Sequence, residues 1–346
     1  MRRSLSFYIA SFALCVAVVV IVLGAYTRLV HAGLGCPDWP TCYGHYWVPN
    51  TPEEIHTANQ NFSATPVEVD KTWPEQIHRI FASSLGLLII GLLIAVIKNR
   101  KAGKQPVKLA AFTLCFVILQ GLFGMWTVTL LLWPQVVTAH LLGGFTTLSL
   151  LWLLVQRLGG FAWTLSKTAQ QKIVRLRGLA VASLLAVILQ IALGGWTTSN
   201  YAALACPDLP TCHGAWLPEM DFSAGFNVLQ HIGPNYLGGQ LDNTARTAIH
   251  FAHRVGAVVV TLVLLSLVTL LWRIGIAESR RMAAIVLSVL LMQLALGISN
   301  VWFGLPLLVA VSHNAVGALL LLVMVTLNHR VFSVQFHTAA EEKQYE

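Results

Sequence analysis

Eight long apolar stretches constrain this chain more than any other feature of its sequence. Each is long enough to cross a hydrocarbon layer of about 30 Å as a helix. The chain is 56% hydrophobic and only 10% charged, a composition that a water-soluble domain could not carry on its surface. We therefore predict an integral membrane protein with transmembrane helices at residues 8–27, 77–97, 109–130, 137–157, 178–197, 249–271, 282–302 and 308–328.

The distribution of basic residues predicts how the chain is oriented. Seventeen of the 22 Lys and Arg residues lie before the first stretch, after the last one, or in alternate connections. Because cytoplasmic segments are enriched in these residues, both termini are expected on the cytoplasmic side. The first stretch follows Arg2 and Arg3 as a signal peptide would, but it lacks a small-residue cleavage pattern, and we predict a retained helix.

The net charge of +8 would also suit a protein that binds nucleic acid. Here the excess positive charge lies in short connections that face anionic lipid headgroups, where it serves orientation. We therefore expect no nucleic-acid partner.

The two halves of the chain repeat one another. The sequence Leu-Gly-Ala-Tyr-Thr at 23–27 recurs as Leu-Gly-Gly-Trp-Thr at 193–197, and both repeats continue into a similar cysteine-containing loop. Each unit holds four predicted spans, so both units start on the same side and are related by an axis along the membrane normal. We expect an all-α protein of two tandem four-helix bundles, with repeats at 1–157 and 178–346 and a cytoplasmic linker at 158–177.

Each repeat carries two cysteines in an outer loop, with five residues between them. Zinc binding is one interpretation, but neither loop has the two-residue spacing of common zinc sites. Thiols this close together outside the cytoplasm normally oxidise. We therefore predict two disulfides, Cys36–Cys42 and Cys206–Cys212.

Four of the twelve histidines lie near the outer ends of apolar stretches at positions that correspond between the two repeats. One such histidine commonly forms a hydrogen bond between helices, but ionisable residues at this depth are costly, and four in repeat-related positions suggest a shared purpose. In each half the two histidines lie at similar depth on helices of the same direction, so both rings can reach one point. Paired axial ligands of a haem iron have this arrangement, and the predicted pairs are His78 with His140 and His253 with His313.

One acidic residue distinguishes the two halves. Glu75 lies three residues before His78, whereas His250 takes the same place before His253. A carboxylate there can accept and release protons, although it would also complement the helix dipole as an N-terminal acid. His250 is a second candidate ligand in the sixth stretch, and the repeat alignment favours His253.

Arginines and glycines accompany these histidines. Arg79 and Arg254 each follow one histidine and could bind haem propionates, although a position at the lipid headgroups is an equal explanation. Glycine follows about one turn after three of the four histidines, where it would make room for a flat macrocycle or simply allow close helix packing.

These residues resemble those of a known family, the haem A synthases. The resemblance rests on Gly-Ala-Tyr-Thr-Arg-Leu at 24–29, Gly-Leu-Gly-Cys-Pro-Asp-Trp-Pro-Thr-Cys-Tyr-Gly at 33–44, Glu-Gln-Ile-His-Arg at 75–79, and the histidines at 140, 253 and 313. It covers nearly the whole chain. The paired cysteines in both outer loops are similar to those of the Gram-negative form.

The resemblance implies a membrane oxidoreductase of the bacterial inner membrane. Such an enzyme oxidises the C8 methyl group of haem O to a formyl group by successive hydroxylation, giving haem A for terminal oxidases. The resemblance further implies a haem b cofactor between His253 and His313, and the substrate between His78 and His140, with both sites toward the periplasm. Glu75 would then be the catalytic residue that handles protons. The haem O synthase and oxidase assembly factors are the implied partners.

A second interpretation is a di-haem membrane cytochrome that only transfers electrons. Four histidines alone fit both functions. The sequence does not identify the electron-transfer partner or the oligomeric state, and a homo-oligomer is one possibility. A third interpretation, a haem transporter or chaperone, predicts release of unchanged haem. The cytochrome would hold two permanent haems, whereas the synthase would hold one permanent haem and one that exchanges.

Overall fold

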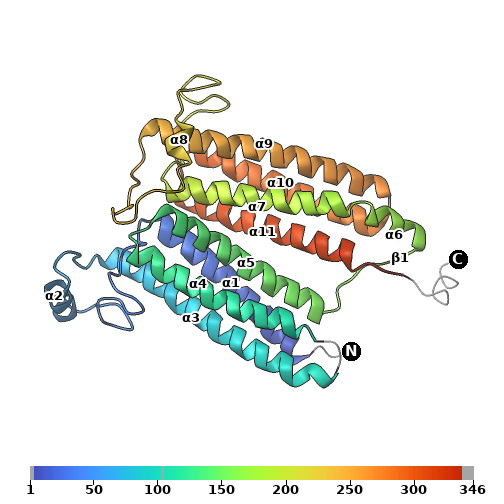
Figure 1. Cartoon of the computed structure of the whole chain (residues 1–346), viewed down its shortest axis with the longest axis horizontal. Helices are drawn as coiled ribbons and strands as arrows, with labels where there is room; N and C mark the ends of the chain where they lie inside the picture. Colours follow the sequence, from blue (N-terminus) through green and yellow to red (C-terminus); the bar gives the residue numbers. More distant parts are fainter. Residues whose placement is uncertain (1–3, 103–104, 337–346) are drawn as a thin grey trace.

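The computed structural model describes residues 4–102 and 105–336 and is built almost entirely of helices (Figure 1). Eight of its helices are long and apolar enough to cross a membrane, which confirms the predicted fold class. They are α1 (Leu5–Leu29), α3 (Val69–Lys98), α4 (Val107–Thr129), α5 (Pro134–Leu158), α7 (Arg177–Ser199), α9 (Asn243–Ile274), α10 (Ala277–Trp302) and α11 (Leu307–Phe332). The termini that we predict to be cytoplasmic, at 1–3 and 337–346, lie outside the described residues.

Short elements connect the long helices. The outer loops contain α2 (Pro52–Asn61) and α8 (Phe222–Gly225), and the opposite end contains η1 (Asn99–Ala102), α6 (Lys167–Val174) and the parallel strands β1 (Thr164–Leu165) and β2 (Gln335–Phe336). Figure 1 shows α2, α8 and the long loops at one end of the helices, and α6 and β1 at the other.

The long helices form two groups of four. Helices α1, α3, α4 and α5 contact one another in a ring, and so do α7, α9, α10 and α11. Contacts between the groups join α1 to α11, α5 to α7, and α5 to α11. Since α1 corresponds to α7 and α5 to α11 in the sequence repeat, a twofold axis between the groups would give this pattern. The contacts are consistent with two tandem bundles.

Two helices begin earlier than their apolar stretches. Helix α3 begins at Val69 and α9 at Asn243, so His78 and His253 lie about two and a half turns inside their helices. The polar first turns of α3 stay helical because Thr72, Glu75 and Gln76 are buried against the first outer loop. Hydropathy marks the apolar part of a helix and misses such a buried polar extension.

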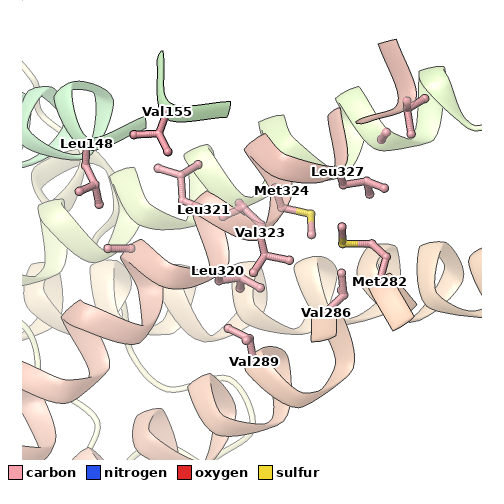
Figure 2. Packing of buried hydrophobic residues seen from close by; sticks show 14 of the residues in the cluster. Leu148, Val155, Met282, Val286, Val289, Leu320, Leu321, Val323, Met324 and Leu327 are labelled. Carbon is pink, nitrogen blue, oxygen red and sulfur yellow. The ribbon is translucent and has the colours of Figure 1, made fainter. Parts of the chain in front are cut away.

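Apolar packing joins the two groups along their length. The largest buried cluster includes residues of α5, α10 and α11, among them Leu148, Val155, Met282, Leu321 and Met324, which Figure 2 shows from close by. A polar contact lies beside it. The Trp152 indole and the Gln156 amide of α5 donate hydrogen bonds to the Thr326 hydroxyl of α11, at 2.7 and 3.2 Å. The groups are therefore fixed by apolar packing and by this shared acceptor.

The outer loops also cross from one group to the other. The Trp133 indole donates to the carbonyl of Gln230 at 3.1 Å, and the Gln135 amide donates to the carbonyl of Val228 at 2.9 Å. The long loop of the second half thus lies over the α4–α5 turn of the first half.

The Thr326 contact gives a stability prediction. Thr326→Val keeps the shape but removes the acceptor of two donors, so we expect the free energy of unfolding to fall by roughly 1 kcal/mol. Unfolding of the purified protein in detergent measures this. Thr269→Val is the control, because the Thr269 hydroxyl is exposed and bonds only to Leu265 of its own helix. Equal stability of the two variants would contradict the prediction.

Candidate functional site

The first histidine pair lies at the loop-bearing end of the N-terminal group. His78 on α3 and His140 on α5 have ring centres 6.5 Å apart and ring planes at 82°. A coordinating imidazole nitrogen lies about 2 Å from its metal, and the ring centre about 1 Å farther, so two rings that share one metal have centres about 6 Å apart. The separation in this chain fits a single iron between the two rings.

The second pair occupies the repeat-related place in the C-terminal group. His253 on α9 and His313 on α11 are close enough to interact electrostatically. His250 has other partners: its Nδ1 accepts from the Cys206 amide at 3.1 Å, and its Nε2 lies 3.3 Å from Nε of Arg254. Both nitrogens of His250 are therefore engaged with the protein. This supports His253, rather than His250, as the partner of His313.

Each of the four rings lies against a glycine of a neighbouring helix. A Cβ atom added to any of these glycines would come within 2.9–3.2 Å of the Cε1 atom of the facing histidine, so a side chain there would displace the ring. The pairs are Gly24 with His78, Gly124 with His140, Gly194 with His253, and Gly297 with His313.

The glycines that follow the histidines by about one turn have a different role. They lie against glutamine side chains of the neighbouring helix and make room for them: Gly143 against Gln120, Gly256 against Gln190, and Gly317 against Gln293. These glutamines were not predicted from the sequence. The signal was present, because Gln-x-x-x-Gly recurs at 120–124, 190–194 and 293–297.

Glu75 is buried and connects α3 to the first outer loop. One carboxylate oxygen accepts from the Cys36 amide at 2.9 Å, and the other accepts from Arg79 at 2.6 Å. Only 4% of the residue is exposed. His250 bridges the Cys206 amide and Arg254 in the same way in the second half. Both residues therefore hold a loop, and only Glu75 adds a carboxylate beside a histidine pair.

Both arginines of the site donate hydrogen bonds to backbone carbonyls of the adjacent cysteine loop. Arg79 donates from Nη1 to the carbonyls of Asp38 and Thr41, at 2.8 and 2.7 Å. Arg254 donates to the carbonyls of Asp208 and Thr211, at 2.8 and 2.9 Å. The guanidinium groups thus have protein partners, and their contact with propionates stays a prediction.

The cysteine loops contain the predicted cross-links, Cys36–Cys42 and Cys206–Cys212. Within residues 4–102 and 105–336, no three His, Cys, Asp or Glu side chains are grouped as a metal ion would need. In the second loop, hydrogen bonds from the Thr211 hydroxyl and from the Gly214 and His213 amides lower the pKa of Asp208 to about 2. The carboxylate thus stays ionised and organises the loop.

The hydrogen bonds from Arg254 to the second cysteine loop give a prediction about loop dynamics. Arg254→Gln removes bonds to the carbonyls of Cys206, Asp208 and Thr211, so amide hydrogen exchange across 206–214 should rise at least about tenfold. Exchange mass spectrometry of the purified protein measures this. Arg246→Gln is the control, because Arg246 of the same helix bonds to Leu241 and Gly238 instead. Equal exchange in the two variants would show that the Arg254 hydrogen bonds do not stabilise the loop.

Comparison with known proteins places this geometry in a family. The family described as cytochrome oxidase assembly protein, COX15-CtaA, matches residues 7–325. A relative from Shewanella oneidensis, named "Heme A synthase", is 45% identical over 311 residues, which cover 90% of this chain and 92% of the relative. Relatives of the same name from Caulobacter vibrioides (26% identity, 90% and 92% coverage) and Halalkalibacterium halodurans (25%, 88% and 89%) are also similar. The chain therefore belongs to the COX15-CtaA family of cytochrome oxidase assembly proteins.

Proposed function

We propose that this chain is a haem A synthase, a membrane oxidoreductase that converts haem O to haem A for terminal oxidases. One observation supports this most strongly: the histidine pair of the first repeat has a separation that fits one iron, and a repeat-related pair lies in the second. The family model spans residues 7–325, and a relative named for this activity aligns with 90% of the chain. The reaction oxidises the C8 methyl group to a formyl group by successive hydroxylation.

The C-terminal repeat, residues 178–346, is the proposed site of a resident haem b. His253 and His313 are its ligands, since His250 is committed to the Cys206 loop. Bound haem supplies the redox chemistry, while the residues of the chain hold and orient it. Glycines beside both rings leave the imidazoles free of side-chain contact on that face.

The N-terminal repeat, residues 1–157, is the proposed substrate site, joined to the other repeat by the linker at 158–177. His78 and His140 hold haem O, and Glu75 accepts and passes protons during the oxidation of the methyl group. Support for Glu75 comes from its burial one turn from His78 and from its absence at the equivalent place in the second repeat, which is His250.

We further propose that both sites face the periplasm of a bacterial inner membrane, with both termini in the cytoplasm. The two disulfides lie near the same helix ends as the histidines, and disulfides persist in the oxidising periplasm. The connections at the opposite end contain most of the basic residues. The haem O synthase and oxidase assembly factors are the expected partners.

Pigment analysis tests the proposed function directly. The purified protein should yield haem B together with haem O, its hydroxylated form or haem A, as identified by mass. His253→Ala should remove haem B, and His78→Ala should remove the farnesylated haem while haem B remains. Haem B in both sites, with no farnesylated haem under any condition, would instead indicate the di-haem cytochrome.

The role of Glu75 gives a separate prediction. Glu75→Gln keeps an acceptor for the Cys36 amide but cannot carry a proton, so conversion of haem O should fall by about 10²–10⁴-fold while the haem b spectrum stays unchanged. Pigment ratios in cells measure conversion. His250→Gln alters the equivalent loop contact in the other half and should leave conversion intact. Full conversion by Glu75→Gln would exclude a proton-handling role.

A further inference from the structure

The four histidines do not have equivalent neighbours. In three of the four places where a helix presents a glycine to a histidine ring, a glutamine lies four residues before that glycine, one turn away on the same face. In the fourth place, on α1, the residue is an apolar one. The set is Gln120 beside His140, Gln190 beside His253, Gln293 beside His313, and Val20 beside His78.

Each glutamine contacts a ring nitrogen of its histidine. Nε2 of Gln190 lies 3.2 Å from Nδ1 of His253 and donates to the His253 carbonyl at 2.9 Å. Gln120 makes the same two contacts with His140, at 3.0 and 2.6 Å. Gln293 contacts the other ring nitrogen of its histidine: its Nε2 lies 3.3 Å from Nε2 of His313, and the Nδ1 atom of His313 is buried without a hydrogen-bond partner.

The glutamines also have unused hydrogen-bonding capacity. The side-chain oxygens of Gln190 and Gln293 are buried without a hydrogen-bond partner. An imidazole that binds iron through one nitrogen carries its proton on the other, and that N–H almost always donates to an oxygen. An amide has both a donor and an acceptor, so the glutamine can turn its oxygen to the ring when the metal is bound.

His78 lacks this support. Its Nδ1 atom is buried without a hydrogen-bond partner, as is that of His313, but the His78 ring interacts with the backbone at Val20 and has no glutamine beside it. The valine side chain cannot accept a hydrogen bond. The N-terminal pair therefore has one histidine contacted by a glutamine, and the C-terminal pair has two.

We propose that Gln190 and Gln293 are positioning residues that lock both ligands of the resident haem, and that Val20 leaves His78 as the releasable ligand of the exchanging haem. This inference rests on the proposed function, because only a synthase needs one haem that stays and one that leaves. Loss of a hydrogen-bonding partner behind a metal ligand typically costs about 10–100-fold in metal affinity. The two sites should differ in haem release by a similar factor.

A reciprocal exchange of residues tests the inference on the full-length, haem-loaded protein. Gln190→Val gives the resident site the environment of His78, and Val20→Gln gives the substrate site the environment of His253. Transfer of each haem to excess apomyoglobin gives the release rates, with the haem identified by mass. We expect haem b to leave about 10–100-fold faster from Gln190→Val, and the N-terminal haem to leave about 10–100-fold more slowly from Val20→Gln.

A second readout separates positioning from general stability. Removing an acceptor from the ligand N–H should raise the midpoint potential of the resident haem in Gln190→Val, and a carboxylate in Gln190→Glu should restore slow release and lower the potential. A tenfold change in the affinity ratio of oxidised to reduced haem corresponds to about 59 mV. Gln156→Leu is the matched control, because the buried side chain of Gln156 donates to Thr326, between the two groups of helices, and contacts no histidine of the site.

The outcomes distinguish the two proposals. If the release rates of Gln190→Val and Val20→Gln lie within twofold of the parent protein and the midpoint potential of the resident haem is unchanged, the proposed role of the glutamines is wrong. This holds whichever haems the protein contains. Haem B alone in both sites would overturn the proposed function, while altered release in the two variants would still show that the glutamines position the ligands.

Discussion

The approach of two histidines to one point inside each group of four helices is the constraint on which the rest of the structure depends. An imidazole at membrane depth is costly unless it has a partner, and a shared iron would give both rings one. Glycines of the neighbouring helices make room for the rings, and glutamines contact three of the four. Apolar packing between the groups, visible around Met324 in Figure 2, holds the frame that keeps these distances.

The outer loops extend this frame into a polar environment. Each loop is closed by a disulfide and held by hydrogen bonds from an arginine that directly follows a histidine on its helix, Arg79 in one half and Arg254 in the other. A further residue, Glu75 in one half and His250 in the other, accepts a hydrogen bond from the backbone amide of the first cysteine of the loop. The duplicated unit thus repeats the same scaffold twice. The different functions proposed for the two halves rest on two differences between the copies, Glu75 against His250 and Val20 against Gln190.

Sequence patterns predicted much of this arrangement, because hydropathy fixes helix number and the repeat fixes which histidines correspond. They could not predict that Glu75 accepts the Cys36 amide, since spacing along one helix says nothing about where a loop folds back. They suggested that Gly143 and Gly256 either make room for a macrocycle or allow close helix packing, and did not predict the glutamine side chains that lie against both. A lone glutamine in an apolar stretch is a weak signal, and only the packing of α4 on α5 and of α7 on α9 shows that each lies at a histidine. The polar first turns of α3 and α9 were missed because burial by a loop replaces the membrane there.

Electron paramagnetic resonance of the oxidised protein tests the central claim, the sharing of one iron by two histidines from alternate helices. The account predicts a low-spin ferric haem with two imidazole ligands, which becomes high-spin when His313→Ala removes one of them. An unchanged low-spin signal in that variant, with haem still bound, would contradict the account.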